Sequence, residues 1–213
     1  LWSSARYTFP LPDGHRFPIA KYAMLRERVV SEEVVPADRV LDPAAATDDD
    51  IRLVHTADYV SRFESGALTP AEERRIGFPW SPGLVERSRR AVGGTIAAAR
   101  HALTHGIGMN LAGGTHHAFA DHGEGFCVYN DVAIAIRALQ RDGLIARAAV
   151  VDEHHLPATT TQAELTARSR ADQAGSQAFW AGFRSSIKGE VTTAGGRPRA
   201  AQTSVTRSPA CAL

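Results

Sequence analysis

The chain has 213 residues, of which 44% are hydrophobic and 22% are charged, and its net charge is +1. This length accommodates one domain of ordinary size and a tail, and this composition is typical of a globular protein. The near-neutral charge gives no argument for a nucleic-acid or membrane surface, and no apolar run approaches the roughly 20 residues that span a bilayer. The two cysteines, Cys127 and Cys211, lie far apart, which argues against a disulfide framework and favours the cytoplasm.

The N-terminal part is expected to begin irregularly and then to become helical. Its prolines predict an extended, turning segment over residues 1–20, because proline is poorly tolerated inside a helix. The apolar residues Tyr22, Leu25 and Val29 follow at spacings of three and four, which predicts a short helix.

Two further helical regions are expected before the middle of the chain. Residues 43–50 read as a loop, and a helical region begins near the acidic run at its end, where negative charge complements the helix dipole. After the irregular stretch FPWSP, an apolar stripe predicts a long helix from about Leu84, and Gly106 is a plausible stop.

The segment after this helix predicts a parallel sheet. GMNLAGG (residues 108–114) and RAAVVD (residues 147–152) read as short buried strands, and Asn130 caps an apolar helix between them. A strand, a loop, a helix and a second strand form a right-handed crossover between parallel strands. Since ligands bind beyond the carboxyl ends of such strands, side chains that follow the two strands should meet at one edge.

The stretch GGTHHAFADHGEGFCVYND places His116 and His117 directly after the first strand. Glycines allow sharp turns, and neutral imidazoles accept protons or bind metals, so the pair is either a reaction centre or a polar loop. His122 is expected to be a solvated loop residue. Cys127 is expected to be a small packed residue, because no catalytic partner is evident for it.

The motifs GGTHHAF and GFCVYND, followed by a strand that ends in Asp152, resemble the histone deacetylase family. LPDGHRFPIAKY and GFPWSPGLVERS are similar to its bacterial and class IV branch, and the similarity covers roughly residues 5–152. The resemblance implies an α/β three-layer fold of the arginase/deacetylase type with a central parallel sheet, incomplete in this chain. It divides the chain into an N-terminal portion of a deacetylase domain (1–152) and a divergent, partly disordered tail (153–213).

The resemblance also implies a metal-dependent amide hydrolase that removes acyl groups from lysine or a related amine. In that family His117 matches the general base that acts on a metal-bound water. His116 matches its neighbour, which stabilises developing charge, and Asp152 matches the carboxylate that orients this neighbour. The implied cofactor is zinc, which lowers the pKa of bound water towards about 7.

Three residues match the substrate channel of the family. Gly125 and Phe126 match the wall of the narrow channel, and Arg16 matches an arginine of the internal cavity below the metal. An aromatic channel suits the alkyl stem of an acyl-lysine peptide or an acylated polyamine. Membrane attachment and direct nucleic-acid binding are not expected.

The metal ligands depart from the family pattern. Where the family has D-x-D-x-H, this chain reads VVDEHHLP, with His154 in place of the second aspartate and Leu156 in place of the histidine. Side chains alternate along a strand, so His154 shares a face with Asp152 and is a candidate metal ligand. No tyrosine follows Tyr129 to polarise the substrate carbonyl. The alternative is therefore a catalytically inactive truncated remnant or a non-enzymatic binding fragment, which these departures favour for the chain as written.

Overall fold

The computed structural model describes residues 1–151. Helices dominate this part of the chain, and loops of very different length join them. In chain order they are the 3-10 helix η1 (Ala5–Tyr7), α1 (Lys21–Ser31), the 3-10 helix η2 (Ala37–Arg39), α2 (Asp48–Ile51), α3 (Ala57–Glu64), α4 (Pro70–Ile76), α5 (Pro82–His105) and α6 (Asp131–Arg141).

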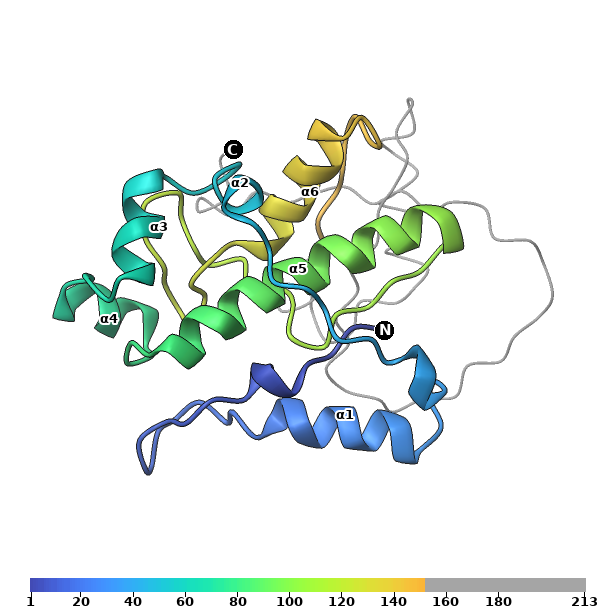
Figure 1. Ribbon diagram of the computed structural model, residues 1–213, viewed down its shortest axis with the longest axis horizontal. Helices are drawn as coiled ribbons and strands as arrows, with labels where there is room; N and C mark the ends of the chain where they lie inside the picture. The colour runs from blue at the N-terminus through green and yellow to red at the C-terminus, as the bar shows by residue number, and fades with distance from the viewer. Residues whose placement is uncertain (152–213) are drawn as a thin grey trace.

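Helix α5 runs through the middle of the molecule, with α6 on one side of it and α1 on the other (Figure 1). The guanidinium of Arg87 on α5 donates to the Tyr22 hydroxyl of α1 at 2.6 Å, which joins the two helices. Helices α3 and α4 lie beyond the N-terminal end of α5 (Figure 1). The side chains of the main core come from helices α2 to α6, from the loops around them and from Phe9 near the N-terminus.

The predicted long helix is confirmed, and its ends follow from local chemistry. Ser81 caps α5 by accepting a hydrogen bond from the Leu84 amide at 3.1 Å, and Pro82 fills the first position, where no amide proton is needed. Gly106 ends the helix with φ of +86°, a conformation that glycine adopts without strain. The helix therefore begins two residues before the predicted start and stops where predicted.

Two adjacent glycines let other segments pack directly on the backbone of α5. A Cβ atom at Gly93 would lie 1.9 Å from the Ala44 carbonyl oxygen. One at Gly94 would lie 2.8 Å from both the Tyr7 hydroxyl and the Asn110 amide nitrogen. The segments that precede α2 and the histidine loop are thus held against the central helix.

The helices predicted around Tyr22 and after Asn130 are confirmed as α1 and α6. The acidic region forms two helices instead of one, because Thr56 interrupts it and caps α3 by accepting from the Tyr59 amide. The end of the loop expected over residues 43–50 is helical instead, because α2 starts at Asp48 and is capped by the capping box of Thr47.

The predicted central sheet is not confirmed in the described part of the chain, which contains no strand. Near the predicted first strand, Trp2 makes single parallel bridges to Leu41 and Asn110, and the chain turns directly afterwards. The Asn110 side chain instead donates to the Ala91 carbonyl of α5, which ties this segment to a helix. Residues 147–151 do not form a strand, and the predicted tail lies outside the described residues.

Among the helices of residues 1–151, none combines the length and the apolar character that crossing a bilayer requires.

Candidate functional site

The loop between α5 and α6 brings the two histidines side by side. Their ring centroids lie 4.3 Å apart, with 36° between the ring planes. The Nδ1 atom of His116 lies 2.9 Å from the carbonyl oxygen of Gly114. Because a carbonyl oxygen can only accept, Nδ1 carries the proton and Nε2 carries the lone pair of the neutral ring. His117 is exposed, so its imidazole is accessible from solvent.

Gly125 and Phe126 form the tip of a tight turn that faces His117. Both have positive φ, +57° and +65°, and Glu124 and Cys127 exchange two backbone hydrogen bonds of 2.9 Å around them. This pattern is that of a two-residue hairpin turn. A Cβ atom at Gly125 would lie 3.6 Å from Cβ of His117, so the turn contacts the histidine loop.

Phe126 is a bulky residue in a conformation that glycine prefers, and its neighbours hold it there. Its amide donates to the Ile76 carbonyl at 2.7 Å, and its ring packs against Phe17 and Phe78 at centroid distances of 4.9 and 5.1 Å. Such strain, of order 1–3 kcal/mol, collects at functional sites. The guanidinium of Arg16 covers this ring at 4.7 Å. The structure thus brings together all three residues predicted for the channel.

Asn130 fixes the histidine loop from the start of α6. Its Oδ1 accepts from the Ala133 amide at 3.0 Å, which caps the helix as predicted. Its Nδ2 donates to the carbonyls of His116 and Ala118, each at 3.2 Å. One side chain therefore ends the loop and orients the backbone that carries the histidines.

Asp131, which the sequence did not single out, is fully buried beside Asn130 and holds the other side of the loop. Its carboxylate accepts from the amides of Gly114 and Thr115 at 3.0 and 2.7 Å, and from the Thr95 hydroxyl of α5 at 2.5 Å. Burial raises the pKa of Asp131, while the hydrogen bonds from Thr95 and Thr115 oppose this rise. In the sequence, the only indication of this role of Asp131 was its position as an acidic residue at the start of an apolar helix.

His55 is a second buried group that the sequence did not reveal. Its side chain is 3% exposed, and its Nε2 accepts from the Asn130 amide at 2.9 Å. Burial lowers the pKa of His55 to about 4, although the backbone of Ala120 and Phe119 raises it slightly. Within the described chain, Nδ1 makes no hydrogen bond of normal geometry. A neutral imidazole thus supports the backbone at the start of α6.

The two remaining predicted site residues, Asp152 and His154, lie outside the described residues. Within residues 1–151, no group of three or more histidine, cysteine or acidic side chains could hold a metal ion. His116 and His117 alone do not supply the three protein ligands that catalytic zinc sites use.

Predictions were also made for Cys127 and His122 of this loop, and the structure agrees with the first more closely than with the second. Cys127 is packed as predicted, and burial raises the pKa of its thiol to about 11, which keeps it protonated. His122 is less solvated than predicted, because its ring stacks on Phe119 at 4.5 Å and its Nδ1 lies 2.6 Å from a carboxylate oxygen of Asp121.

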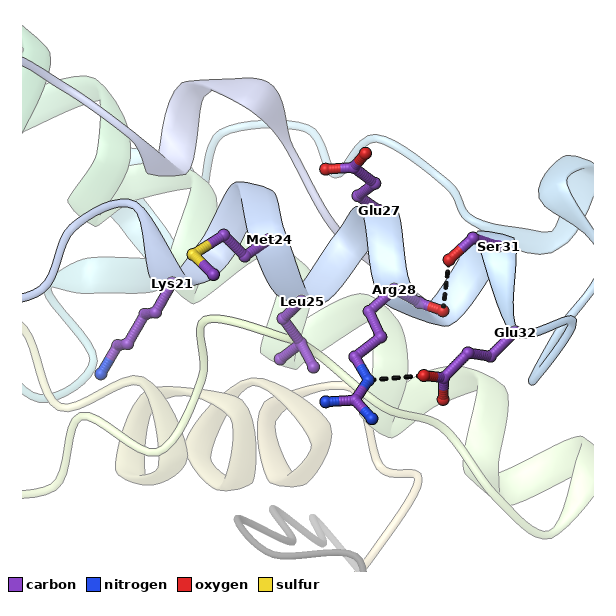
Figure 2. Close-up of a pocket in the computed structure, with 7 residues that line it drawn as sticks. All are labelled: Lys21, Met24, Leu25, Glu27, Arg28, Ser31 and Glu32. Atoms are coloured by element: carbon purple, nitrogen blue, oxygen red, sulfur yellow. Dashed lines mark hydrogen bonds and ion pairs between the residues drawn. The ribbon is translucent and has the colours of Figure 1, made fainter.

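A shallow depression of about 500 Å³ lies on α1, away from the histidine loop. Figure 2 shows Leu25, Arg28 and Glu32 leaving the same side of this helix, with Arg28 and Glu32 paired at 2.6 Å. None of its lining residues belongs to the predicted site. Because the depression is open and gathers no convergent polar groups beyond this pair, we place the candidate site at the histidine loop.

Comparison with solved structures shows the fold to which this arrangement belongs. A histone deacetylase (HDAC) homologue complexed with SAHA matches with a TM-score of 0.59 and 24% identity, over 70% of this chain and 42% of that chain. An HDAC homologue from Aquifex aeolicus matches with a TM-score of 0.56 and 23% identity, over the same shares. The described part of the chain therefore shares its fold with part of the deacetylase domain.

Sequence comparisons point to the same family. An uncharacterized protein of Picosynechococcus sp. is 47% identical over 146 residues, which are 68% of this chain and 49% of that protein. The acetoin utilization protein AcuC of Bacillus subtilis is 29% identical, over 66% of this chain and 39% of its own length. The chain thus spans half or less of these relatives. The family model described as histone deacetylase domain matches residues 15–159, and the chain belongs to the histone deacetylase family.

Proposed function

We propose that this chain contributes the proton-transfer residues of a deacetylase-type site, which hydrolyses the acyl amide of lysine or of an acylated polyamine. The observation that carries the proposal is the arrangement of His116 and His117. They lie next to each other in a loop that Asn130 and Asp131 fix, and against the turn of Gly125. Family membership supports the reaction class, since its motifs surround these residues.

The chemistry divides between the two imidazoles. Amide hydrolysis needs a base for the attacking water and a proton for the leaving amine. His117 is the exposed imidazole and is proposed as the base. His116, whose Nδ1–H is directed at the Gly114 carbonyl, is proposed to stabilise developing charge. Its predicted carboxylate partner, Asp152, stays a proposal.

The family implies zinc, which would activate the water and polarise the acyl carbonyl. Residues 1–151 do not form a site for it, so no step through the metal is derived for this chain. Phe126, under the Arg16 guanidinium, is proposed to line the path of the alkyl stem of the substrate. Apolar walls with few polar groups suit such a stem.

The test is turnover of a fluorogenic acetyl-lysine peptide by the purified chain, with zinc content measured in the same sample. We expect His117→Ala to lower the rate by roughly 10²- to 10⁴-fold, the usual contribution of a general base. His122→Gln, in the same loop, should leave the rate unchanged. A folded chain without turnover would instead favour the inactive binding fragment.

A further inference from the structure

A buried polar network runs from the N-terminal segment to the start of α6. Its four members, each at most 9% exposed, are Tyr7 of η1, Asn110 after α5, Thr95 of α5 and Asp131 of α6. The Tyr7 hydroxyl lies 2.9 Å from Oδ1 of Asn110, and Nδ2 of Asn110 lies 2.9 Å from the Thr95 hydroxyl oxygen. The Thr95 hydroxyl lies 2.5 Å from Oδ2 of Asp131. Side chains from four separate segments are thus connected by hydrogen bonds.

Backbone groups around Asn110 fix the direction of these hydrogen bonds. Its Nδ2 donates to the Ala91 carbonyl at 2.8 Å, and its Oδ1 accepts from the Ala112 amide at 3.2 Å. Since a carbonyl can only accept and an amide N–H can only donate, the orientation of the side-chain amide is determined. The Tyr7 hydroxyl must therefore donate to Oδ1, and the Thr95 hydroxyl must accept from Nδ2.

The network ends on the backbone that precedes the histidine pair. Thr95 keeps its own proton, whose acceptor is the Asp131 carboxylate. The same carboxylate accepts from the amides of Gly114 and Thr115 at 3.0 and 2.7 Å. The His116 amide in turn donates to the Gly114 carbonyl at 3.0 Å. Asp131 therefore connects the network to the two residues directly before His116.

Gly113 leaves the space that this arrangement needs. A Cβ atom there would lie 2.7 Å from the Thr95 hydroxyl oxygen, 3.0 Å from Oδ2 of Asp131 and 3.2 Å from Nδ2 of Asn110. Only a residue without a side chain lets the loop approach three members of the network at once. The first glycine of GGTHH therefore has a packing role, which is to bring the loop against the network.

We propose that this network positions the histidine pair, with Tyr7 and Thr95 acting through Asp131. Each donor orients the next one, so the position of the loop depends on a hydroxyl that lies 103 residues before Asn110 in the chain. Connected buried hydrogen bonds strengthen one another, because each bond polarises the next. The inference rests on the proposed function, since it assigns the network to the two imidazoles that are proposed to transfer protons.

The experiment compares variants of Thr95 by NMR, using the imidazole signals of His116 and His117 and the exchange of the Thr115 amide with solvent. Thr95→Val keeps the branched shape but removes the hydroxyl. We expect it to shift both imidazole signals and to speed the exchange at least roughly tenfold, because a carboxylate that loses a buried donor favours the opened, solvated loop. Thr95→Ser keeps the hydroxyl and should retain the wild-type signals. Loss of stability alone would not shift the signals of the folded protein.

Two further variants show whether the effect belongs to the network. Tyr7→Phe removes only the first hydroxyl and should shift the same imidazole signals in the same direction, by a smaller amount. Thr104→Val makes the matched change near the C-terminal end of α5, where the hydroxyl donates to the His101 carbonyl of the same helix. It should leave the signals of the histidine loop unchanged.

Three results would overturn the inference. They are imidazole signals that Thr95→Val leaves unchanged, signals that shift equally in Thr95→Ser, and signals that do not respond to Tyr7→Phe. None of these measurements requires turnover. An inactive chain whose signals respond as expected would therefore contradict the proposed function and still support the positioning role of the network.

Discussion

The side chain of Asn130 combines two structural roles. Its oxygen caps α6, and its amide nitrogen holds the loop that carries His116. The first role is local and is shared by serine, threonine and aspartate at helix starts. The second depends on a donor, which an aspartate at the same position lacks. The two roles can therefore be separated by a single substitution.

Asn130→Asp should lower the free energy of unfolding by about 1–3 kcal/mol, the cost of leaving buried acceptors without a donor. The new carboxylate keeps the cap but faces the carbonyls of His116 and Ala118. Urea unfolding measures the difference. Thr56→Asp, at the cap of α3, is the control and should change the stability little, because its side chain serves only as an acceptor. Equal stability of both variants would refute the loop-holding role.

Around Asn130, residue patterns predict the local contacts of the site but not the long-range ones. The cap was predictable, because it depends on neighbours in sequence. The contact of Asp131 with Thr95 joins residues on different helices, and the burial of His55 depends on the packed loop. Neither follows from local spacing. The assignment of Gly125 and Phe126 to a channel wall came from family resemblance rather than from periodicity, and their contact with the histidine loop was not predicted.

At the level of elements, α4 positions the candidate channel wall. Its last residues, Arg75 and Ile76, accept hydrogen bonds from the amides of Gly125 and Phe126. The helix begins with a capping box, in which Thr69 and Glu72 exchange hydrogen bonds. Glu72 also accepts from Arg62, and these bonds lower its pKa to about 2, with the Thr69 amide the largest cause. Destabilising this short helix should therefore also weaken the hydrogen bonds that hold the Gly125–Phe126 turn.

Thr69→Ala should destabilise α4 by about 1 kcal/mol, the typical cost of losing such a cap. We expect the Phe126 amide to exchange with solvent roughly fivefold faster, since its acceptor is at the end of this helix. Hydrogen exchange followed by NMR measures the rate. Thr47→Ala removes the equivalent capping box of α2 and provides the control. A Phe126 amide that responds equally to both variants would count against the coupling.

The elements differ in how well sequence predicted them. Helices α5 and α6 are long, striped and capped, so local signals agree and the predictions were correct. Helix α4 was not predicted, although its Thr69–Glu72 capping box is visible in the sequence, because its few residues carry little apolar periodicity. The sheet was predicted from buried apolar runs, but a strand also needs partners along its length. Asn110 has only the single bridge to Trp2 in the described residues.

On the scale of the whole molecule, the core contains a buried, neutral histidine, His55. His55 packs against the rings of Tyr59 and Tyr129 at centroid distances of 5.7 and 5.2 Å, and it accepts from the Asn130 amide. A proton added to Nε2 would remove that acceptor and place a charge inside the core. Folding and protonation of His55 therefore oppose each other.

The sign of the resulting pH dependence follows from the two pKa values. The pKa of His55 falls from 6.5 in the unfolded chain to about 4 in the folded protein, chiefly through burial. Between these values the unfolded chain binds a proton that the folded protein does not. The stabilising contribution is therefore complete above pH 6.5 and is lost as the pH falls towards 4.

We expect urea unfolding to show a loss of about 2 kcal/mol in stability between pH 7 and pH 5, at about 1.4 kcal/mol for each pH unit below 6.5. His55→Gln can keep an acceptor for the Asn130 amide but cannot be protonated. It should be less stable than the wild type at pH 7 because its packing differs, yet lose little further stability down to pH 5. His122→Gln, in the loop, should keep the wild-type slope. If His55→Gln and the wild type had the same slope, the pH dependence would have to come from groups other than His55.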